Sequence, residues 1–355
     1  MNNAIAQTTL ATVVRTLTTT LRQHYGIDPL PVLQHVGIDP AVMDDSELRL
    51  PMTTLSPLWL RCVEVTGDPA FGLRAVRYHQ PANLYGIDLA LYACANLAEA
   101  VQRQVQLVQV ISTSGAADLQ QDDQGDWRLS FRPIGVAQPT LPARDFYLLV
   151  HIRMFERLCR IPAAQLFRTF EFYRGPEQVS DQWQTLDVPL TYHQPHAALV
   201  FRQEHWLQPL PGANPRLLAQ VEQPILRYLA QHGLPLPLSA LRGQLANQLQ
   251  GQPAPERLAQ ALGLTPALLQ DNLRQHGLSF AQLLDQTREA QSLLLLASTS
   301  LPLETIATRV GFSSATGLAK AFRRWRATTP MSYRRAMHAP QAGDSHSVTL
   351  ERYPD

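Results

Sequence analysis

Apolar residues recur at the spacing of one helical face along three stretches near the start of the chain, residues 8–23, 53–66 and 85–110. Each stretch predicts an amphipathic helix. In the third, Asn96 is followed three residues later by Glu99, the order of a capping box. This pair predicts that the third stretch divides into two helices.

Farther along, apolar and polar residues alternate, as in strands with one buried face. Two alternating segments flank DDQGD, residues 122–126, which predicts a hairpin turn. Two more strands are predicted within residues 166–174 and 197–206, and a helix is predicted within residues 142–161. Residues 1–206 are therefore expected to form an α+β domain.

Strand patterns then stop, and proline and glycine separate short helical patterns. Helices are expected near residues 214–231 and 236–250, inside a helical linker region spanning 207–252. An all-α domain is predicted over residues 253–338. Residues 339–355 are expected to form a flexible tail.

Two similar units occur within this all-α domain. They read PERLAQALGLTPALLQDNLRQHG and LETIATRVGFSSATGLAKAFRRW. Each has a short helical pattern ending at a glycine, Gly263 or Gly311, then a capping residue, Thr265 in the first unit and Ser313 or Ser314 in the second, then a second helical pattern. This order predicts two helix-turn-helix units.

The charge of the chain is concentrated in the second unit. The whole chain has a formal net charge of only +1, with 45% hydrophobic and 17% charged residues. No acidic residue lies between Thr305 and Gly343. The cations of that interval are Arg309, Lys320, Arg323, Arg324, Arg326, Arg334 and Arg335. Such a patch favours contact with the phosphates of DNA, whose bound counterions it would release; the competing interpretation is a solvated helix pair.

The second helix of this unit has one apolar face and one basic face. The residues expected to pack inward are Leu318, Phe322 and Trp325. Short residues at the helix start allow close approach to base edges, and the later cations suit phosphates. The residues predicted to contact DNA are Ser314, Ala315, Thr316, Lys320, Arg323 and Arg324.

Motifs of enzymes, cofactors and metals are not recognised in the chain. His193 and His196 stand near each other without a nearby cysteine or carboxylate, so loop histidines are favoured over metal ligands. The sequence has no GxSxG elbow and no GxxxxGK[ST] phosphate loop. We therefore predict a protein that is not an enzyme and binds no cofactor or metal. Three widely separated cysteines and the lack of an apolar run of about 20 residues predict a cytoplasmic protein.

The stretch LPLETIATRVGFSSATGLAKAFRRWRATTPMSYRR, residues 301–335, resembles the C-terminal signature of the AraC/XylS family of bacterial transcription regulators. Residues 85–109, 141–159 and 197–217 resemble the branch of this family with a long N-terminal domain, the ornithine- and virulence-regulator type. The resemblance implies an α+β N-terminal domain of the effector or dimerisation type, followed by the double helix-turn-helix domain. It also implies that the long helix joining the two units starts at Arg288.

The chain departs from the family pattern in both units. The first recognition helix of many relatives is rich in arginine, whereas here it reads TPALLQDNL. Asp271 would repel phosphates unless it accepts from a cytosine amino group or pairs with a neighbouring arginine. In the second unit, Ala327 stands where glycine is usual. The residues predicted to contact DNA more weakly, from the first unit, are Thr265, Ala267, Gln270, Asp271 and Arg274. The alternative is that this unit packs against the second one and contributes little to base readout.

The hypothesis from these patterns is a sequence-specific transcription regulator that binds double-stranded DNA and responds to a small-molecule effector in its N-terminal domain. The effector residues are not identified. RNA polymerase and a second copy of the chain are further partners that the resemblance allows, and no membrane partner is expected. The alternative is a ligand-binding or scaffold protein whose C-terminal helices bind a protein partner.

Overall fold

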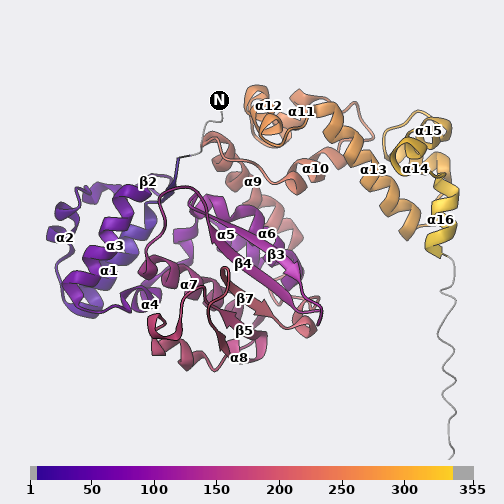
Figure 1. Cartoon of the computed structure of the whole chain (residues 1–355). Helices are drawn as coiled ribbons and strands as arrows, with labels where there is room; N and C mark the ends of the chain where they lie inside the picture. The colour runs from indigo at the N-terminus through magenta and orange to yellow at the C-terminus, as the bar shows by residue number, and fades with distance from the viewer. Residues whose placement is uncertain (1–5, 339–355) are drawn as a thin grey trace, which may run out of the picture. The chain divides into compact units, whose positions relative to one another are not determined.

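The computed structural model describes residues 6–338 and divides the chain into two compact units that meet between Pro237 and Leu238 (Figure 1). The first unit combines a sheet with helices, and the second is entirely helical over the residues described. The predicted fold class, α+β followed by all-α, is confirmed.

A five-stranded sheet organises the first unit. Its strands, in spatial order, are β3 (Gly115–Gln121), β4 (Trp127–Pro133), β7 (Ala197–Phe201), β5 (Phe167–Glu171) and β6 (Leu190–Thr191). Neighbouring strands are antiparallel except for β5 and β6, which are parallel.

The predicted hairpin joins β3 to β4. Asp122 closes the turn, because its carboxylate accepts hydrogen bonds from the backbone N–H groups of Gln124 and Asp126, both at 2.9 Å. Gly125 has a φ of +85°, a conformation that glycine adopts without steric cost. The hairpin prediction at DDQGD is confirmed.

The first unit also contains nine α-helices among the residues described. They are α1 (Thr12–Tyr25), α2 (Pro29–His35), α3 (Met52–Thr66), α4 (Phe71–Ala75), α5 (Ile87–Tyr92), α6 (Leu97–Ile111), α7 (Leu141–Cys159), α8 (Ala163–Leu166) and α9 (Pro215–Gln231). The predicted division at Asn96 is confirmed, since its side chain accepts from the backbone N–H of Glu99 at 2.9 Å and starts α6. Trp59 and Phe146 are buried in the core between α3 and α7.

The expected helix from Thr8 was wrong at its start. Thr8–Leu10 forms a strand, β1, which pairs antiparallel with β2, Arg49–Pro51. Arg49 reinforces this pair by donating to the hydroxyl and the backbone carbonyl of Thr8, at 2.8 and 3.2 Å. A partner strand about forty residues away therefore decides the local structure, which the helical spacing alone does not show.

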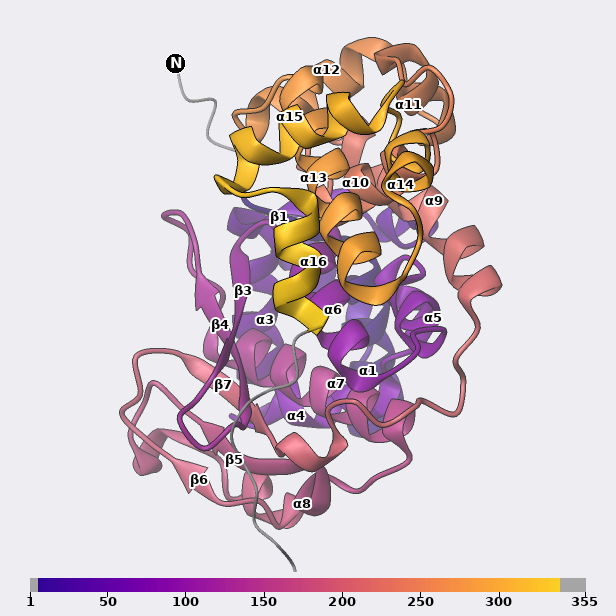
Figure 2. The same ribbon diagram turned by 90° about the vertical axis from the view of Figure 1, so that its right-hand side faces the viewer.

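The second unit contains helices only, among the residues described. They are α10 (Leu238–Ala246), α11 (Pro255–Ala261), α12 (Pro266–Gln275), α13 (Phe280–Ser298), α14 (Leu303–Arg309), α15 (Ala315–Arg326) and α16 (Pro330–His338). The α11–α12 and α14–α15 pairs flank α13 (Figure 1), and Figure 2 presents α15 and α16 toward the viewer. This order is the predicted pair of helix-turn-helix units.

The connecting helix α13 begins earlier than the family pattern implied. It starts after Ser279, whose hydroxyl accepts from the backbone N–H of Gln282 while the Gln282 side chain accepts from the backbone N–H of Ser279. This capping box satisfies two N–H groups that the helix leaves free. Arg288 therefore lies in the middle of α13, and the expectation that it starts the helix was wrong.

The expected linker, residues 207–252, contains α9 in the first unit and α10 in the second. Its boundaries stay a prediction, and the expected tail over 339–355 lies outside the described residues. No helix within residues 6–338 is long and apolar enough to span a membrane.

Two glycines that each follow a helix, although not at matching places in the two units, allow a test of backbone conformation at the helix ends. Gly277 follows α12 and Gly311 follows α14, with φ of +65° and +81°. A Cβ at Gly277 would meet nothing within 4 Å, whereas a Cβ at Gly311 would lie 2.3 Å from the backbone oxygen of Leu249. Gly277→Ala should cost about 1 kcal/mol, from the left-handed backbone alone.

We expect Gly311→Ala to cost about 3 kcal/mol or more, because backbone atoms must also move. Urea unfolding of the two variants of the full-length protein measures both values. Equal losses of stability would show that the Leu249 contact does not constrain the turn.

Candidate nucleic-acid interface

The start of α15 is fixed by two side chains. Ser314 caps the helix, with its hydroxyl accepting from the backbone N–H of Gly317 at 3.2 Å. Glu304, in the first turn of α14, accepts from the backbone N–H of Ala315 at 3.0 Å. The two helices of the second unit are therefore joined by one hydrogen bond, from Ala315 to Glu304, as well as by the turn at Gly311.

The inner face of α15 packs as predicted. Leu318 and Phe322 are fully buried, and Trp325 is half-buried against the same core cluster. The ring of Phe322 lies edge-on to that of Tyr333, at 5.6 Å between centroids. Because this face is apolar and filled, the opposite face is the one available to a partner.

The outer face holds the DNA-contact residues predicted from the second unit. Thr316, Lys320, Arg323 and Arg324 are exposed, while Ser314 and Ala315 are half-buried at the helix start. Thr316, Lys320 and Arg323 are spaced by four and three positions, and Arg324 lies four positions after Lys320, so these residues form one stripe along α15.

The cations of α15 fall into two groups. Arg324 pairs with Asp285 of α13 at 2.5 Å, and Arg326 pairs with Glu289 of α13 at 2.8 Å. Lys320 and Arg323 form no ion pair with any residue in the described part of the chain. Asp285 and Glu289 precede the interval between Thr305 and Gly343 that has no acidic residue. The charge pattern of that interval alone therefore overstated the number of unpaired cations.

Asp285 has a second role, which sequence reasoning missed. It also accepts from the indole Nε1–H of Trp325, at 2.9 Å. One carboxylate of α13 thus receives donors from two adjacent residues of α15 and fixes the rotation of that helix. Nothing in the local sequence around Asp285 marks it for this contact.

Arg288 supports the turn of the same unit. Its Nη2 donates to the backbone oxygen of Gly311 at 2.9 Å, and its guanidinium lies 4.9 Å from the centre of the Phe312 ring. Burial lowers the pKa of Arg288. Arg288 is therefore a positioning residue, whose guanidinium contacts the turn between α14 and α15.

The first unit presents a weaker surface on α12. Thr265 caps the helix through a bond from the backbone N–H of Leu268 at 3.3 Å, and every DNA-contact residue predicted in this unit is exposed. Asp271 forms an ion pair with Arg274 one turn later. The sequence left two possibilities for Asp271, acceptance from a cytosine amino group and pairing with a neighbouring arginine. The structure shows the pairing with Arg274, and the two charges cancel on the exposed face of α12.

Residues considered for other chemistry lie in the first unit. Phe167, Phe170 and Phe172 are fully buried core residues, whereas Tyr173 and His196 line a cavity of about 360 Å³. Within the described chain, no group of three histidine, cysteine or acidic side chains is placed to hold a metal ion. The sequence named no effector residue, because the cavity lining comes from many separate segments.

Comparisons with known proteins match both units. A model described as the arabinose-binding domain of the AraC transcription regulator, N-terminal, matches residues 26–210, and one described as a helix-turn-helix domain matches residues 258–336. The ornithine utilization regulator of Pseudomonas aeruginosa is 27% identical over 319 residues, which cover 88% of this chain and 92% of that protein.

Two further similarities span most of the chain. The transcriptional regulator VirS of Mycobacterium tuberculosis is 26% identical over 325 residues, covering 89% of this chain and 93% of that protein. The crystal structure of the transcriptional regulator CdpR from Pseudomonas aeruginosa aligns with a TM-score of 0.47 at 16% identity, over 86% of this chain and 96% of that chain.

The two acids of α13 predict different losses of stability. Asp285→Ala removes the acceptor of both Arg324 and Trp325, so we expect it to lower the free energy of unfolding by about 1–3 kcal/mol. Glu289→Ala breaks only the Arg326 pair, whose arginine is exposed, and should cost less than about 1 kcal/mol. Urea unfolding followed by helical circular dichroism compares them, and a larger loss for Glu289→Ala would contradict the role given to Asp285.

Proposed function

The chain belongs to the AraC family of DNA-binding transcription regulators, and from this membership we propose that α15 is the helix that anchors it in the major groove. The observation that supports this most directly is the pair of exposed, unpaired cations, Lys320 and Arg323, on a helix with a rigid apolar inner face. A major groove about 12 Å wide admits one α-helix.

In this proposal the parts of α15 have different roles. Ser314, Ala315 and Thr316 stand at the helix start, where short side chains bring the backbone near base edges. Lys320 and Arg323 contact phosphates, which fixes the position of the helix without reading sequence. Arg324 keeps its bond to Asp285 and offers only its remaining N–H groups to a phosphate.

The contribution of α12 is proposed to be smaller and mainly polar. Gln270 is exposed and has the amide that suits the N6 and N7 atoms of adenine. Asp271 and Arg274 neutralise each other, so this helix adds little to the electrostatic attraction. The charges therefore support a model in which α12 discriminates between DNA sequences and α15 attaches the protein to DNA.

For the first unit we propose that a small molecule binds in it and changes the affinity for DNA. The matching model is named for arabinose and one relative for ornithine utilization, but neither name carries over to this chain by itself. The support is the cavity, together with Arg49, which joins the β1–β2 pair to Tyr228 of α9 at 3.1 Å. Self-association and contact with RNA polymerase stay predictions.

Single substitutions on α15 test the anchoring helix. Lys320→Ala and Arg323→Ala should each weaken binding to a selected genomic DNA fragment and reduce the slope of log affinity against log salt by about 1, because each loses one phosphate contact. Electrophoretic shift or anisotropy titrations at several salt concentrations measure both effects.

Arg326→Ala is the matched control, since it removes the same charge from the same helix at a residue already paired with Glu289. Its salt slope should change by less than that of either test variant. If Lys320→Ala and Arg323→Ala leave the slope unchanged, α15 does not contact the phosphates.

The ion pair on α12 predicts an increase in affinity. Asp271→Asn removes a negative charge and releases Arg274, so binding to an unrelated duplex should strengthen by about threefold at low salt. Arg274→Ala should have the opposite effect. Should neither substitution alter affinity for the unrelated duplex or the selected fragment, α12 lies away from the DNA.

A further inference from the structure

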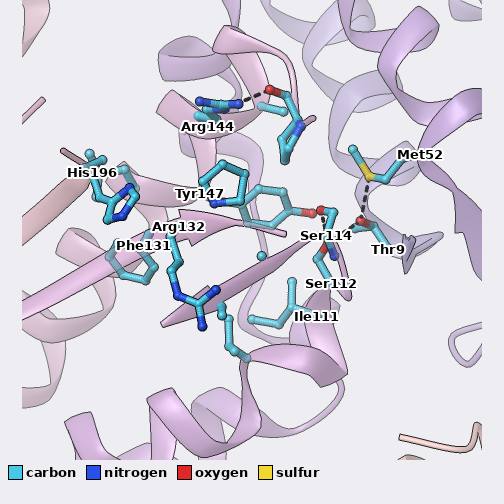
Figure 3. Close-up of a pocket in the computed structure, with 18 of the residues that line it drawn as sticks. Thr9, Met52, Ile111, Ser112, Ser114, Phe131, Arg132, Arg144, Tyr147 and His196 are labelled. Atoms are coloured by element: carbon cyan, nitrogen blue, oxygen red, sulfur yellow. Dashed lines mark hydrogen bonds between the residues drawn. The ribbon is translucent and has the colours of Figure 1, made fainter. Parts of the chain in front are cut away.

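The first unit contains a partly open cavity of about 360 Å³ (Figure 3). Its walls come from α3, α6 and α7, from strands β3 and β4, and from the segment just before β7. The volume is near the lower end of the range of about 300–1,000 Å³ typical of small-molecule sites, so a compact ligand would fill it.

Most of the lining is apolar. Met52, Leu55 and Trp59 of α3 line the cavity, as does Ile111 at the end of α6. None of the described residues that line the cavity is an aspartate or a glutamate. A ligand with an ammonium group would therefore lose its hydration there without gaining a carboxylate partner, which is costly.

One cation in the lining has no acidic partner. Arg144 of α7 donates to the backbone oxygen of Pro139 and to the side-chain oxygen of Gln138, both at 2.8 Å, and it forms no ion pair with any residue within 6–338. Its neighbour Asp145 is paired with Arg174 at 2.5 Å instead. Half-buried cations are usually paired, so Arg144 is suited to an anion that enters the cavity.

The other lining cation differs in this respect. Arg132 of β4 already pairs with Asp118 across the hairpin at 2.8 Å. His151 adds no charge, because burial lowers its pKa and outweighs the opposite effect of the hydrogen bond between its Nδ1 and the backbone oxygen of Tyr147, at 2.6 Å. Arg144 is therefore the one unbalanced charge among the described lining residues.

Hydroxyl groups gather at a different part of the wall. Thr9, Ser112 and Ser114 form a chain of hydroxyl contacts at 2.8 and 2.7 Å, and in Figure 3 the hydroxyl of Tyr147 points toward them. The Tyr147 hydroxyl has no hydrogen-bond partner among the described residues, and burial raises its pKa, so it remains a proton donor. It is suited to a neutral oxygen atom of a ligand.

We infer that this cavity binds a compact monocarboxylate with a ring-sized apolar body, held by Arg144 at its carboxylate and by Tyr147 at a neutral oxygen on the opposite end. The inference rests on the proposed effector response, since it names the chemical class of that effector. The apolar body lies against Met52, Leu55 and Trp59.

Three related probes test the class by calorimetry on the full-length protein without DNA: 3-phenylpropionate, 3-(4-hydroxyphenyl)propionate and 3-phenylpropylamine. Both acids should bind, the hydroxylated one more tightly, and the amine at least about tenfold more weakly. Binding of the amine as tight as that of the acids, or no binding of either acid at millimolar concentration, overturns the inference.

Variants then assign the polar contacts. Arg144→Gln should weaken both acids by about tenfold or more, because a hydrogen-bonded charge partner is lost. Arg132→Gln, the matched lining cation with its own acid, should change affinity by less than about threefold. Tyr147→Phe should weaken only the hydroxylated acid. Unchanged melting temperatures show that the variants are folded; where Arg144→Gln is not, Arg144→Lys, which keeps the charge, replaces it and should lose affinity less.

The two proposals fail in different ways. If the acids bind with the predicted variant pattern and leave the affinity for the selected DNA fragment unchanged, the ligand class stands and the effector response is wrong. If Arg132→Gln weakens the acids as much as Arg144→Gln, the assignment of the carboxylate to Arg144 is overturned, whatever the effect on DNA.

Discussion

The orientation of α15 depends on Asp285. This carboxylate receives a guanidinium from Arg324 and an indole N–H from Trp325, so it holds two neighbouring residues of α15 against α13. Since Trp325 also packs on the core side, the bond sets which residues of α15 face outward. Lys320 and Arg323 are exposed and form no ion pair among the described residues, whereas Arg324 is paired with Asp285.

Signals that act over a few residues could be predicted from the sequence. The caps at Asn96 and Ser314, the glycine turn at Gly311 and the Asp122 hairpin each depend on neighbours within the same segment, and all are present. Contacts between distant segments could not. The Arg324–Asp285 pair joins residues 39 apart, and the cavity is assembled from separate elements of the first unit.

Ala327 shows how the packing tolerates a local cost. It ends α15 with a φ of +54°, in the left-handed region that the family usually fills with glycine. An alanine there costs about 1 kcal/mol relative to glycine. Phe322 and Trp325 bury the preceding turn against α13 and α16, and this apolar contact exceeds the cost, so the helix keeps its end.

Arg49 determines how the cavity of the first unit is connected to α9. Its guanidinium donates to backbone oxygens of Thr8 and Val110 and to the hydroxyl of Tyr228. Thr9 and Ile111, which directly follow Thr8 and Val110 in the chain, line the cavity. A ligand that displaced either residue would therefore strain bonds of Arg49, and α9, which carries Tyr228, would have to adjust or oppose it.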